Sequence, residues 1–368
     1  IYIKIKIMQK IKLYIFHPYS RIGGADLSLS RLINNLDMKK YNISFITLDK
    51  PKINLYLKNK IKIHIIKKKR SIFSIFELRK IVQKDKNKFS KVIFLSNQHF
   101  ANIISILALA NLDWIKLILI ERNNPIELDY SNAAKDKLIK ILIKITYRYA
   151  DKIISISKEL GRDLERLCNK KVNTVYNAAY DNNILKLAEK KINKTSKIIL
   201  NVARFEKQKN HLMLLKSFKM IHKKINAKLV LIGYGSEKKN ILKYIKENGL
   251  KKKVLLITNS KNIFSYYKAA DLFVLTSFYE GFGNVLVEAG MFKVPIISTN
   301  CKSGPKEILN YGKFGDLIKI DDTKTLSKLI VKNLKKPNKL KILKMYKSLK
   351  IFNIKNHIKK YEEIFNKI

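Results

Sequence analysis

Two glutamates separated by seven residues stand in the segment SFYEGFGNVLVEAG, residues 277–290. Glu280 follows an apolar run typical of a buried strand, and Glu288 lies just over one turn into a predicted helix that begins at Asn284. That helix is otherwise apolar, and a carboxylate there is costly to bury without partners. Carboxylates accept hydrogen bonds from vicinal diols, so the hydroxyl groups of a ligand would be suitable partners for Glu288. The other interpretation is that Glu288 pairs with a lysine at the surface.

Two basic residues, Arg204 and Lys209, lie in the loop RFEKQKNH, residues 204–211, after another apolar run. A helix is predicted to begin near Asn210. A cation pair beside a helix N-terminus combines positive charge with free backbone N–H groups, which suits a diphosphate. Two solvated surface charges are the alternative.

Glycines and one histidine occupy similar positions elsewhere. Gly23 and Gly24 open a helix after the first apolar run, and Gly233 ends the run at 227–233. Glycine lets a backbone approach a ligand closely, although a bare turn would also use it. His99 follows the run at 91–96, where it is either catalytic or structural.

Apolar runs alternate with helical patterns almost throughout, which predicts parallel sheets covered on both faces. The fold class is therefore α/β, with two doubly wound Rossmann-like domains that face each other across a cleft. Ligands of such sheets bind beyond the carboxyl ends of the strands. We predict an N-terminal domain over 1–177, a linker over 178–195, a C-terminal domain over 196–343 and helices over 344–368 that pack across the domain junction. The runs are 11–16, 43–48, 61–66, 91–96, 116–121, 152–157 and 172–177, then 197–203, 227–233, 254–258, 271–277, 294–300 and 315–320.

The charge is extreme: 77 Lys and Arg against 28 Asp and Glu give a formal net charge of +49. An anionic partner is one interpretation, and the codon bias of an AT-rich genome is the other. Two segments, 67–80 and 137–149, combine basic residues with apolar ones at helical spacing, which favours an anionic membrane surface over nucleic acid. An ordinary helix with a solvated basic face is the alternative. No apolar run reaches the ~18 residues of a membrane span. No signal peptide is evident, and Met8 is a plausible start.

Several segments together resemble the retaining glycosyltransferases of family 4, which have the GT-B fold. The segments are RIGGADLSLSRL, VYNAAY, NVARFEKQKNH and EGFGNVLVE, in the family's order along essentially the whole chain. One departure is Val-Ala-Arg-Phe where the family has Gly-Arg-Leu. The segments ERNNP and TNCKSGPKEIL look most like the subgroup that builds bacterial surface polysaccharides and lipid-linked oligosaccharides.

The resemblance implies a role for each candidate residue. Arg204 and Lys209 would hold the donor diphosphate and stabilise its charge as the sugar leaves. Glu280 would contact the donor sugar, Glu288 the ribose, and His99 the transferred sugar. The remaining predicted contacts are donor contacts at Gly281, Phe282, Gly283, Asn284 and Gly233, and contacts with the diphosphate and acceptor at Gly23 and Gly24.

The resemblance also implies the reaction. A hexose or N-acetylhexosamine would move with retention from a nucleotide sugar, UDP favoured over GDP, to a lipid-linked or polysaccharide acceptor. The resemblance further implies that the reaction needs neither a metal nor a cofactor. It also implies a peripheral protein on the cytoplasmic face of the inner membrane. Two alternatives stay open: a nucleotide-sugar epimerase on the same scaffold, and a non-enzymatic binder of anionic surfaces or nucleic acid.

Overall fold

The chain divides into two compact units, each built around one parallel sheet. Unit 1 comprises Ile1–Asn177 with Ile354–Ile368, and unit 2 comprises Ala178–Asn353. The computed structural model describes residues 10–19, 23–68, 71–130, 133–188, 191–258, 260 and 262–368. The proposed start at Met8 lies outside these residues.

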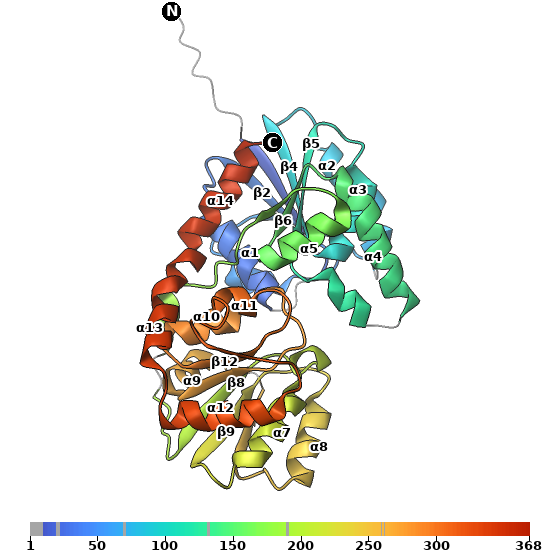
Figure 1. Cartoon of the computed structure of the whole chain (residues 1–368). Helices are drawn as coiled ribbons and strands as arrows, with labels where there is room; N and C mark the ends of the chain where they lie inside the picture. The colour runs from blue at the N-terminus through green and yellow to red at the C-terminus, as the bar shows by residue number, and fades with distance from the viewer. Residues whose placement is uncertain are drawn as a thin grey trace, which may run out of the picture. The chain divides into compact units, whose positions relative to one another are not determined.

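Unit 1 holds a seven-stranded sheet with the order β3-β2-β1-β4-β5-β6-β7 (Figure 1). Every pairing is parallel; in β1, for example, Ile11 lies opposite Tyr41 on one side and Lys91 on the other. Helices cover both faces, which is why its central strands are continuous apolar runs. The strands are β1 (Ile11–Phe16), β2 (Tyr41–Thr47), β3 (Lys62–Ile65), β4 (Lys91–Asn97), β5 (Ile115–Glu121), β6 (Lys152–Ser155) and β7 (Val172–Thr174).

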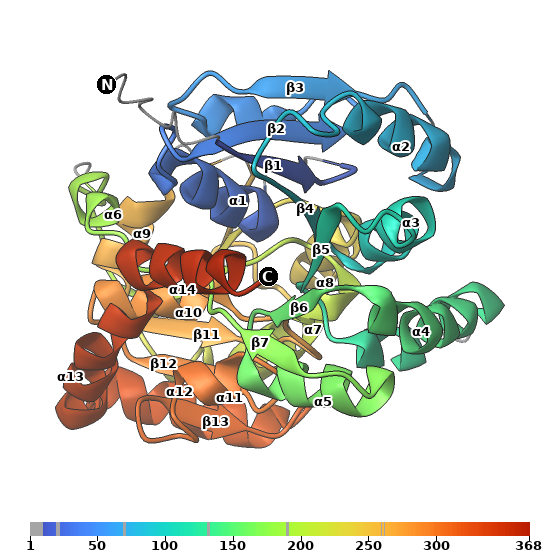
Figure 2. The same cartoon turned by 90° about the horizontal axis from the view of Figure 1, so that it is seen from above.

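The helices of unit 1 form two layers (Figure 2). On one face, α1 (Gly24–Asn35) contacts α14 (Ile354–Asn366). On the other, α2 (Ile75–Gln83), α3 (His99–Leu109), α4 (Ala134–Thr146) and α5 (Lys158–Cys168) pack side by side in chain order. Short 3-10 turns complete the unit: η1 (Lys52–Tyr56), η2 (Ser71–Ser74), η3 (Pro125–Tyr130) and η4 (Tyr147–Tyr149).

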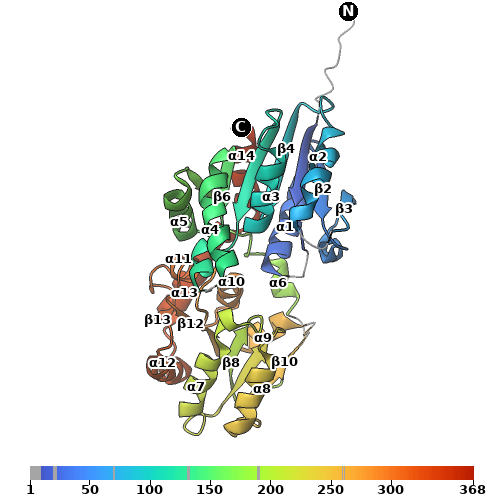
Figure 3. The same ribbon diagram turned by 90° about the vertical axis from the view of Figure 1, so that its right-hand side faces the viewer.

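Unit 2 holds a six-stranded parallel sheet with the order β10-β9-β8-β11-β12-β13. Its strands are β8 (Lys197–Val202), β9 (Ala227–Ile232), β10 (Val254–Ile257), β11 (Leu272–Leu275), β12 (Ile296–Thr299) and β13 (Asp316–Ile318). A buried core that includes Phe205, Phe218 and Leu326 fills the space between the sheet and α7, α8 and α12 (Figure 3). The helices are α6 (Asn183–Lys186), α7 (His211–Ile221), α8 (Lys238–Glu247), α9 (Ile263–Ala269), α10 (Asn284–Met291), α11 (Pro305–Ile308), α12 (Thr323–Lys335) and α13 (Lys339–Ser348), with η5 (Lys207–Lys209) and η6 (Leu349–Phe352).

The predicted fold class is confirmed: each of the predicted apolar runs overlaps a strand, and both sheets are parallel and doubly wound. The predicted boundaries differ from the observed units in two places. The segment 178–195, predicted as a linker, belongs to unit 2. There the backbone N–H of Tyr180 donates to Phe352 O at 3.0 Å, and Tyr180 forms a parallel bridge with Asn353.

The second correction concerns the helices predicted to begin at 344. The first of them, α13, begins earlier, because the Asn338 side chain caps it by accepting a hydrogen bond from the Lys341 N–H at 3.0 Å. This helix packs on α10 of unit 2, where Met345 fills the space left by Gly290. Only α14 joins unit 1, where it contacts α1.

Candidate functional site

The loop after β8 in unit 2 is fixed to the end of β11 by hydrogen bonds. Asn210 adopts a left-handed conformation with φ of 46° and caps α7 by accepting a hydrogen bond from the Met213 N–H. The hydroxyl of Thr276 lies 3.1 Å from the carbonyl oxygen of Lys209 and 3.0 Å from that of Asn210. The amide of Gln208 donates to Tyr279 O at 2.8 Å. The two loops therefore form one structure at the carboxyl edge of the sheet.

The structure brings the predicted residues Lys209 and Glu280 into direct contact. Lys209 Nζ lies 2.6 Å from Glu280 Oε1, and the Ser277 hydroxyl donates to the same oxygen at 2.7 Å. Only 7% of Glu280 is exposed. A carboxylate buried to this degree requires such partners, since a lone buried charge is unstable. Nothing in the spacing of the sequence pointed to Ser277.

Arg204 differs from Lys209 in its surroundings. It is exposed on the same loop, and no carboxylate of the described residues lies within ion-pair distance of it. Its guanidinium presents a planar set of N–H donors, which suits a bidentate contact with phosphate oxygens. The predicted cation pair thus consists of one paired lysine and one arginine available to an anion.

Glu288 lies half-buried on α10, where it accepts a hydrogen bond from the Tyr267 hydroxyl at 3.0 Å. Tyr267 is fully buried, with its ring stacked on Phe273 at 5.5 Å and on Phe292 at 6.0 Å between centroids. Burial, together with Glu288, raises the pKa of Tyr267 well above its ordinary value, so the hydroxyl remains a donor. Sequence reasoning missed Tyr267, because an aromatic residue in a helix usually indicates core packing alone.

The glycine-rich turn before α10 is built for close backbone approach. Gly283 has φ of +97° and precedes the first residue of the helix, Asn284. A Cβ on Gly304 would lie 1.9 Å from Phe282 O. Phe282 itself was predicted to contact the donor, but its side chain is buried and packs edge-on against Phe352 at 5.3 Å. Only its main chain remains for such a contact.

Two other predicted glycines have structural reasons for their identity. A Cβ on Gly233 would lie 1.9 Å from Ala203 O, so the loops after β8 and β9 pack closely only because this residue lacks a side chain. Gly23 N–H donates to Asp26 Oδ2 at 3.1 Å at the start of α1. Neither observation tests the predicted ligand contacts, which stay predictions. Gly24 is the first residue of α1, and Gly281 lies half-buried before Phe282.

In unit 1, His99 is the first residue of α3 and is buried. Its Nδ1 lies 3.8 Å from Glu121 Oε1 and 4.0 Å from Glu127 Oε1. Burial lowers the pKa of His99, but Glu121, with Glu127 and Asp136, outweighs it, and the pKa is raised above its ordinary value. Glu121, at the end of β5, was not singled out from the sequence.

Arg122, in the segment ERNNP at the end of β5, has a buried guanidinium. Its Nε donates to Asn97 Oδ1 at 2.5 Å and its Nη1 to Asn177 Oδ1 at 2.9 Å. Burial lowers the pKa of Arg122. Arg122 therefore links the carboxyl ends of β4 and β5 to Asn177, the last residue of the N-terminal part of unit 1.

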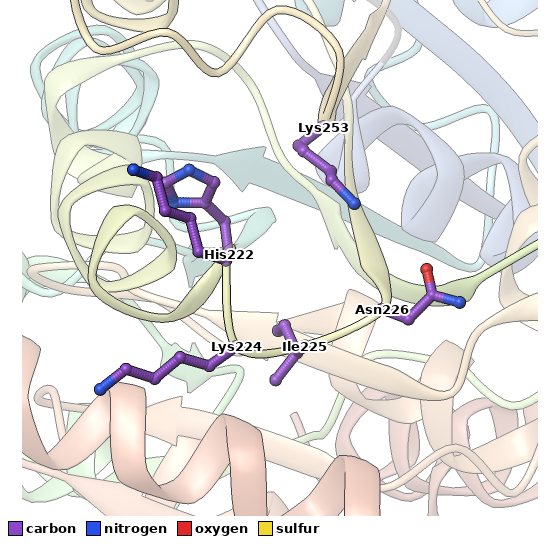
Figure 4. Close-up of a pocket in the computed structure, with 6 residues that line it drawn as sticks. His222, Lys224, Ile225, Asn226 and Lys253 are labelled. Atoms are coloured by element: carbon purple, nitrogen blue, oxygen red, sulfur yellow. The ribbon is translucent and has the colours of Figure 1, made fainter.

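The surface hollow in Figure 4 lies away from these residues. Its lining, His222 to Asn226 with Lys253, falls at the amino ends of β9 and β10, whereas Lys209 and Glu280 lie beyond the carboxyl ends of β8 and β11. Across the described part of the chain, no group of three or more His, Cys, Asp or Glu side chains is arranged to hold a metal ion. Likewise, none of its helices combines the length and hydrophobicity needed to cross a bilayer.

Comparison with known proteins agrees with this arrangement. Residues 184–349 match the family model described as glycosyl transferases group 1. An uncharacterized glycosyltransferase of Methanocaldococcus jannaschii is 36% identical over 55% of the chain. An N-acetylgalactosamine-N,N'-diacetylbacillosaminyl-diphospho-undecaprenol 4-alpha-N-acetylgalactosaminyltransferase of Campylobacter jejuni is 32% identical over 61%. These alignments span 56% and 62% of the two relatives' own lengths.

A solved structure supports the fold over the full length. Anabaena HepE in complex with UDP and glucose superposes with a TM-score of 0.80 at 16% identity, over 97% of this chain and 100% of that one. At this identity the likeness concerns the fold, which is GT-B.

Proposed function

From the match of residues 184–349 to the model of group 1 glycosyl transferases, we propose that the chain belongs to this family and that the whole protein transfers a sugar from a nucleotide donor to a glycan acceptor. The observation that carries the proposal is the Lys209–Glu280 ion pair at the carboxyl edge of the unit 2 sheet, with the unpaired Arg204 on the same loop. This edge is where doubly wound sheets bind nucleotides.

Within this proposal, unit 2 binds the donor. Arg204 contacts the diphosphate, and Lys209 stabilises the negative charge that develops on it as the bond to the sugar breaks. Glu280, held by Lys209 and Ser277, accepts hydrogen bonds from sugar hydroxyls. Glu288, fixed by Tyr267, binds the ribose hydroxyls. The arrangement supplies positive charge to the leaving group from side chains, so we propose that the reaction needs no metal.

The remaining features of the reaction are proposals by similarity. The donor is a UDP-hexose or UDP-N-acetylhexosamine, as UDP and glucose are bound by the Anabaena protein. The acceptor is a lipid-linked or polysaccharide glycan, as the Campylobacter relative's name indicates for that enzyme. Transfer proceeds with retention, with His99 of unit 1 in contact with the transferred sugar and Gly23 and Gly24 near the acceptor.

The test is a thermal-shift screen against UDP- and GDP-sugars, followed by transfer to a polyprenyl-diphosphate-linked sugar and NMR of the product's anomeric configuration. We expect one UDP-sugar to stabilise the protein. We expect Lys209→Met to lower kcat by about 10²–10³-fold, as removal of a group that stabilises transition-state charge does. Lys207→Met, two residues away on an exposed side chain, is the matched control. Full activity in Lys209→Met would reject the site, and an altered sugar in the absence of acceptor would indicate an epimerase.

We further propose that unit 1 docks on the cytoplasmic face of the inner membrane as a peripheral protein. The apolar stripe of α4 is exposed at Leu138, Ile141 and Ile145, while the helix uses Ile139 and Ile143 to face the core. An ordinary amphipathic helix would instead bury its apolar stripe. This outward stripe supports a lipid-facing role for the helix.

We define the apolar-basic surface as the exposed apolar and basic side chains on and beside α4, α3, α2 and η2, elements that are neighbours in this order. Beyond α4, it includes Phe73 and Phe76, of which Phe76 is 83% exposed, and Phe100 and Leu107 of α3 between them. Its basic members are Lys68, Lys80, Lys137, Lys144 and Arg148, all of which are exposed. Exposed aromatic and aliphatic side chains flanked by lysines complement anionic headgroups over a hydrocarbon interior. Residues 69 and 70 of the predicted basic cluster lie outside the described residues.

Vesicle sedimentation tests the membrane proposal. We expect binding to vesicles that contain phosphatidylglycerol and weak binding to pure phosphatidylcholine. Phe73→Ser/Phe76→Ser should lose most of the binding, whereas Leu242→Ser, an exposed leucine on α8 of unit 2, should retain it. Equal binding by both variants would reject the apolar-basic surface.

A further inference from the structure

We propose that Glu121 is a positioning residue, which holds the imidazole of His99 in the orientation that contacts the transferred sugar. The inference rests on the proposed function, because it takes the sugar contact of His99 from there. The structural part of the inference concerns Glu121 and His99 alone, and it can be tested without any sugar.

Glu121 is a fully buried carboxylate that the fold holds rigidly. It is the last residue of β5, and its Oε1 accepts hydrogen bonds from the N–H groups of Arg122 at 3.0 Å and Asn123 at 3.2 Å. Its Oε2 accepts from the Tyr147 hydroxyl at 2.7 Å, and Asn102 Nδ2 donates to that hydroxyl at 3.0 Å. Three donors thus hold the two oxygens of this buried carboxylate in one orientation.

His99 presents one ring nitrogen to this carboxylate. Its Nδ1 is buried, lies 3.8 Å from Glu121 Oε1, and has no hydrogen-bond partner within the part of the chain that is described. A small movement of the ring would close this gap, and hydrogen bonds in ligand-free active sites often tighten when substrate binds. The carboxylate therefore favours a proton on Nδ1 and leaves Nε2, at the opposite edge of the ring, for a ligand.

The backbone at this point is held in a strained conformation. Gln98, immediately before His99, has φ of +80° although it carries a side chain. Its N–H donates to Ile120 O at 3.0 Å, and the Asn102 side chain donates to the same oxygen at 3.0 Å. Strain of this kind persists only where surrounding contacts enforce it, and it concentrates at functional sites. Here the contacts join the start of α3 to the end of β5, which places His99 beside Glu121.

The charges that face His99 come from three elements. Glu121 ends β5, Glu127 lies in η3, and Asp136 lies in α4; all three favour the imidazolium. On the same side of the helix, Lys135 Nζ lies 5.3 Å from the Phe100 ring centroid, and Phe100 is itself in contact with His99 at 4.6 Å between rings. Of the acidic groups, only Glu121 is fully buried, so its charge is the least screened by water.

Histidine-selective NMR of the intact protein tests the inference. The chain has six histidines, and His99→Gln assigns the signal of His99. We expect His99 to titrate above its ordinary pKa of about 6.5, and Glu121→Gln to lower its proton affinity about tenfold, which is one pH unit. Glu127→Gln, which removes the more exposed carboxylate, should lower the proton affinity of His99 less than Glu121→Gln does. Unchanged titration in Glu121→Gln, with the other histidine signals in place, would overturn the inference.

A second measurement needs no variant. The ¹⁵N shifts of the neutral ring at high pH report which nitrogen carries the proton, and we expect the Nδ1–H tautomer. An Nε2–H tautomer would overturn the inference even if Glu121→Gln failed to fold.

Kinetics then connect the two proposals. In an active enzyme, Glu121→Gln should lower kcat about tenfold with little change in donor KM, and should move the limb of the pH profile that reports His99 to lower pH. An enzyme with no transfer activity but an Nδ1–H tautomer and a shifted titration would reject the proposed function and leave the positioning intact.

Discussion

Breaking the Lys209–Glu280 ion pair should separate its contribution to stability from its contribution to catalysis. The exposed fractions of the two side chains are 13% and 8%, so the pair is largely removed from water. Removal of one partner from a buried pair leaves an uncompensated charge and costs about 3–5 kcal/mol. Replacement of both partners with uncharged residues removes that penalty. We therefore expect Lys209→Met to destabilise unit 2 by about 3 kcal/mol, and Lys209→Met/Glu280→Gln to recover most of this loss.

Urea unfolding supplies the assay with an internal control. The only tryptophan of the chain, Trp114, lies in unit 1, so its fluorescence follows unit 1, while far-UV circular dichroism follows both units. With m of about 1–3 kcal/mol per M, the single variant should shift the unit 2 midpoint by about 1 M or more and leave the fluorescence midpoint unchanged. The double variant should regain most of the unit 2 urea midpoint, but it should not regain the transfer activity. A double variant as unstable as the single one would refute the reasoning, because the two charges would then not be coupled.

Three further outcomes are expected. Gly304→Ala should destabilise the protein by more than the ~1–2 kcal/mol that a side chain at positive φ costs, because its Cβ would also meet a carbonyl oxygen at 1.9 Å. Gly249→Ala is the control: it also lies at positive φ but in open space, so it should cost only that ~1–2 kcal/mol. Thermal unfolding of the two variants measures the difference. Tyr267→Phe keeps the buried ring but loses the hydroxyl that donates to the carboxylate on α10, and should raise the donor KM with a stability loss of about 1 kcal/mol. Burial raises the pKa values of Cys168 and Cys301 to about 12, so a disulfide-exchange reagent at about pH 8 should modify neither thiol before unfolding; rapid labelling of the native protein would contradict this.

The sheets could be predicted because their central strands are buried on both faces. A central strand such as Lys91–Asn97 contains a continuous apolar run, here residues 92–95, that helical spacing cannot produce. The start of α13 could not be predicted in the same way, since it depends on a single capping side chain, Asn338. The return of α14 to unit 1 depends on contacts between residues more than three hundred positions apart, such as Tyr41 with Phe365, which no local pattern records.

The residues of the candidate site likewise fall into two groups, those that the local sequence reveals and those that only the three-dimensional fold brings into the site. Glu280 and Glu288 stand out locally because acidic residues are rare in apolar surroundings, and Lys209 because it lies in a loop directly before a helix. Ser277 was visible only as the last residue of the predicted run 271–277, and its bond to Glu280 depends on the three-dimensional path of the loop. Tyr267 reaches Glu288 from another helix, twenty-one positions earlier in the chain.

The path of the chain through the two units bears on how the protein is made. Unit 2 is contiguous, and its first and last residues are joined where Tyr180 bridges Asn353. Unit 1 is interrupted, and its α14 supplies Tyr361, Phe365 and the His357 ring, whose Nδ1 lies 2.7 Å from Tyr176 O. During synthesis unit 2 can therefore finish folding while unit 1, although begun first, still lacks one side of its core. A ribosome-bound chain that stops at Asn353 should expose the α14-facing surface of α1 to chaperones and proteases, and the addition of residues 354–368 as a separate peptide should protect it.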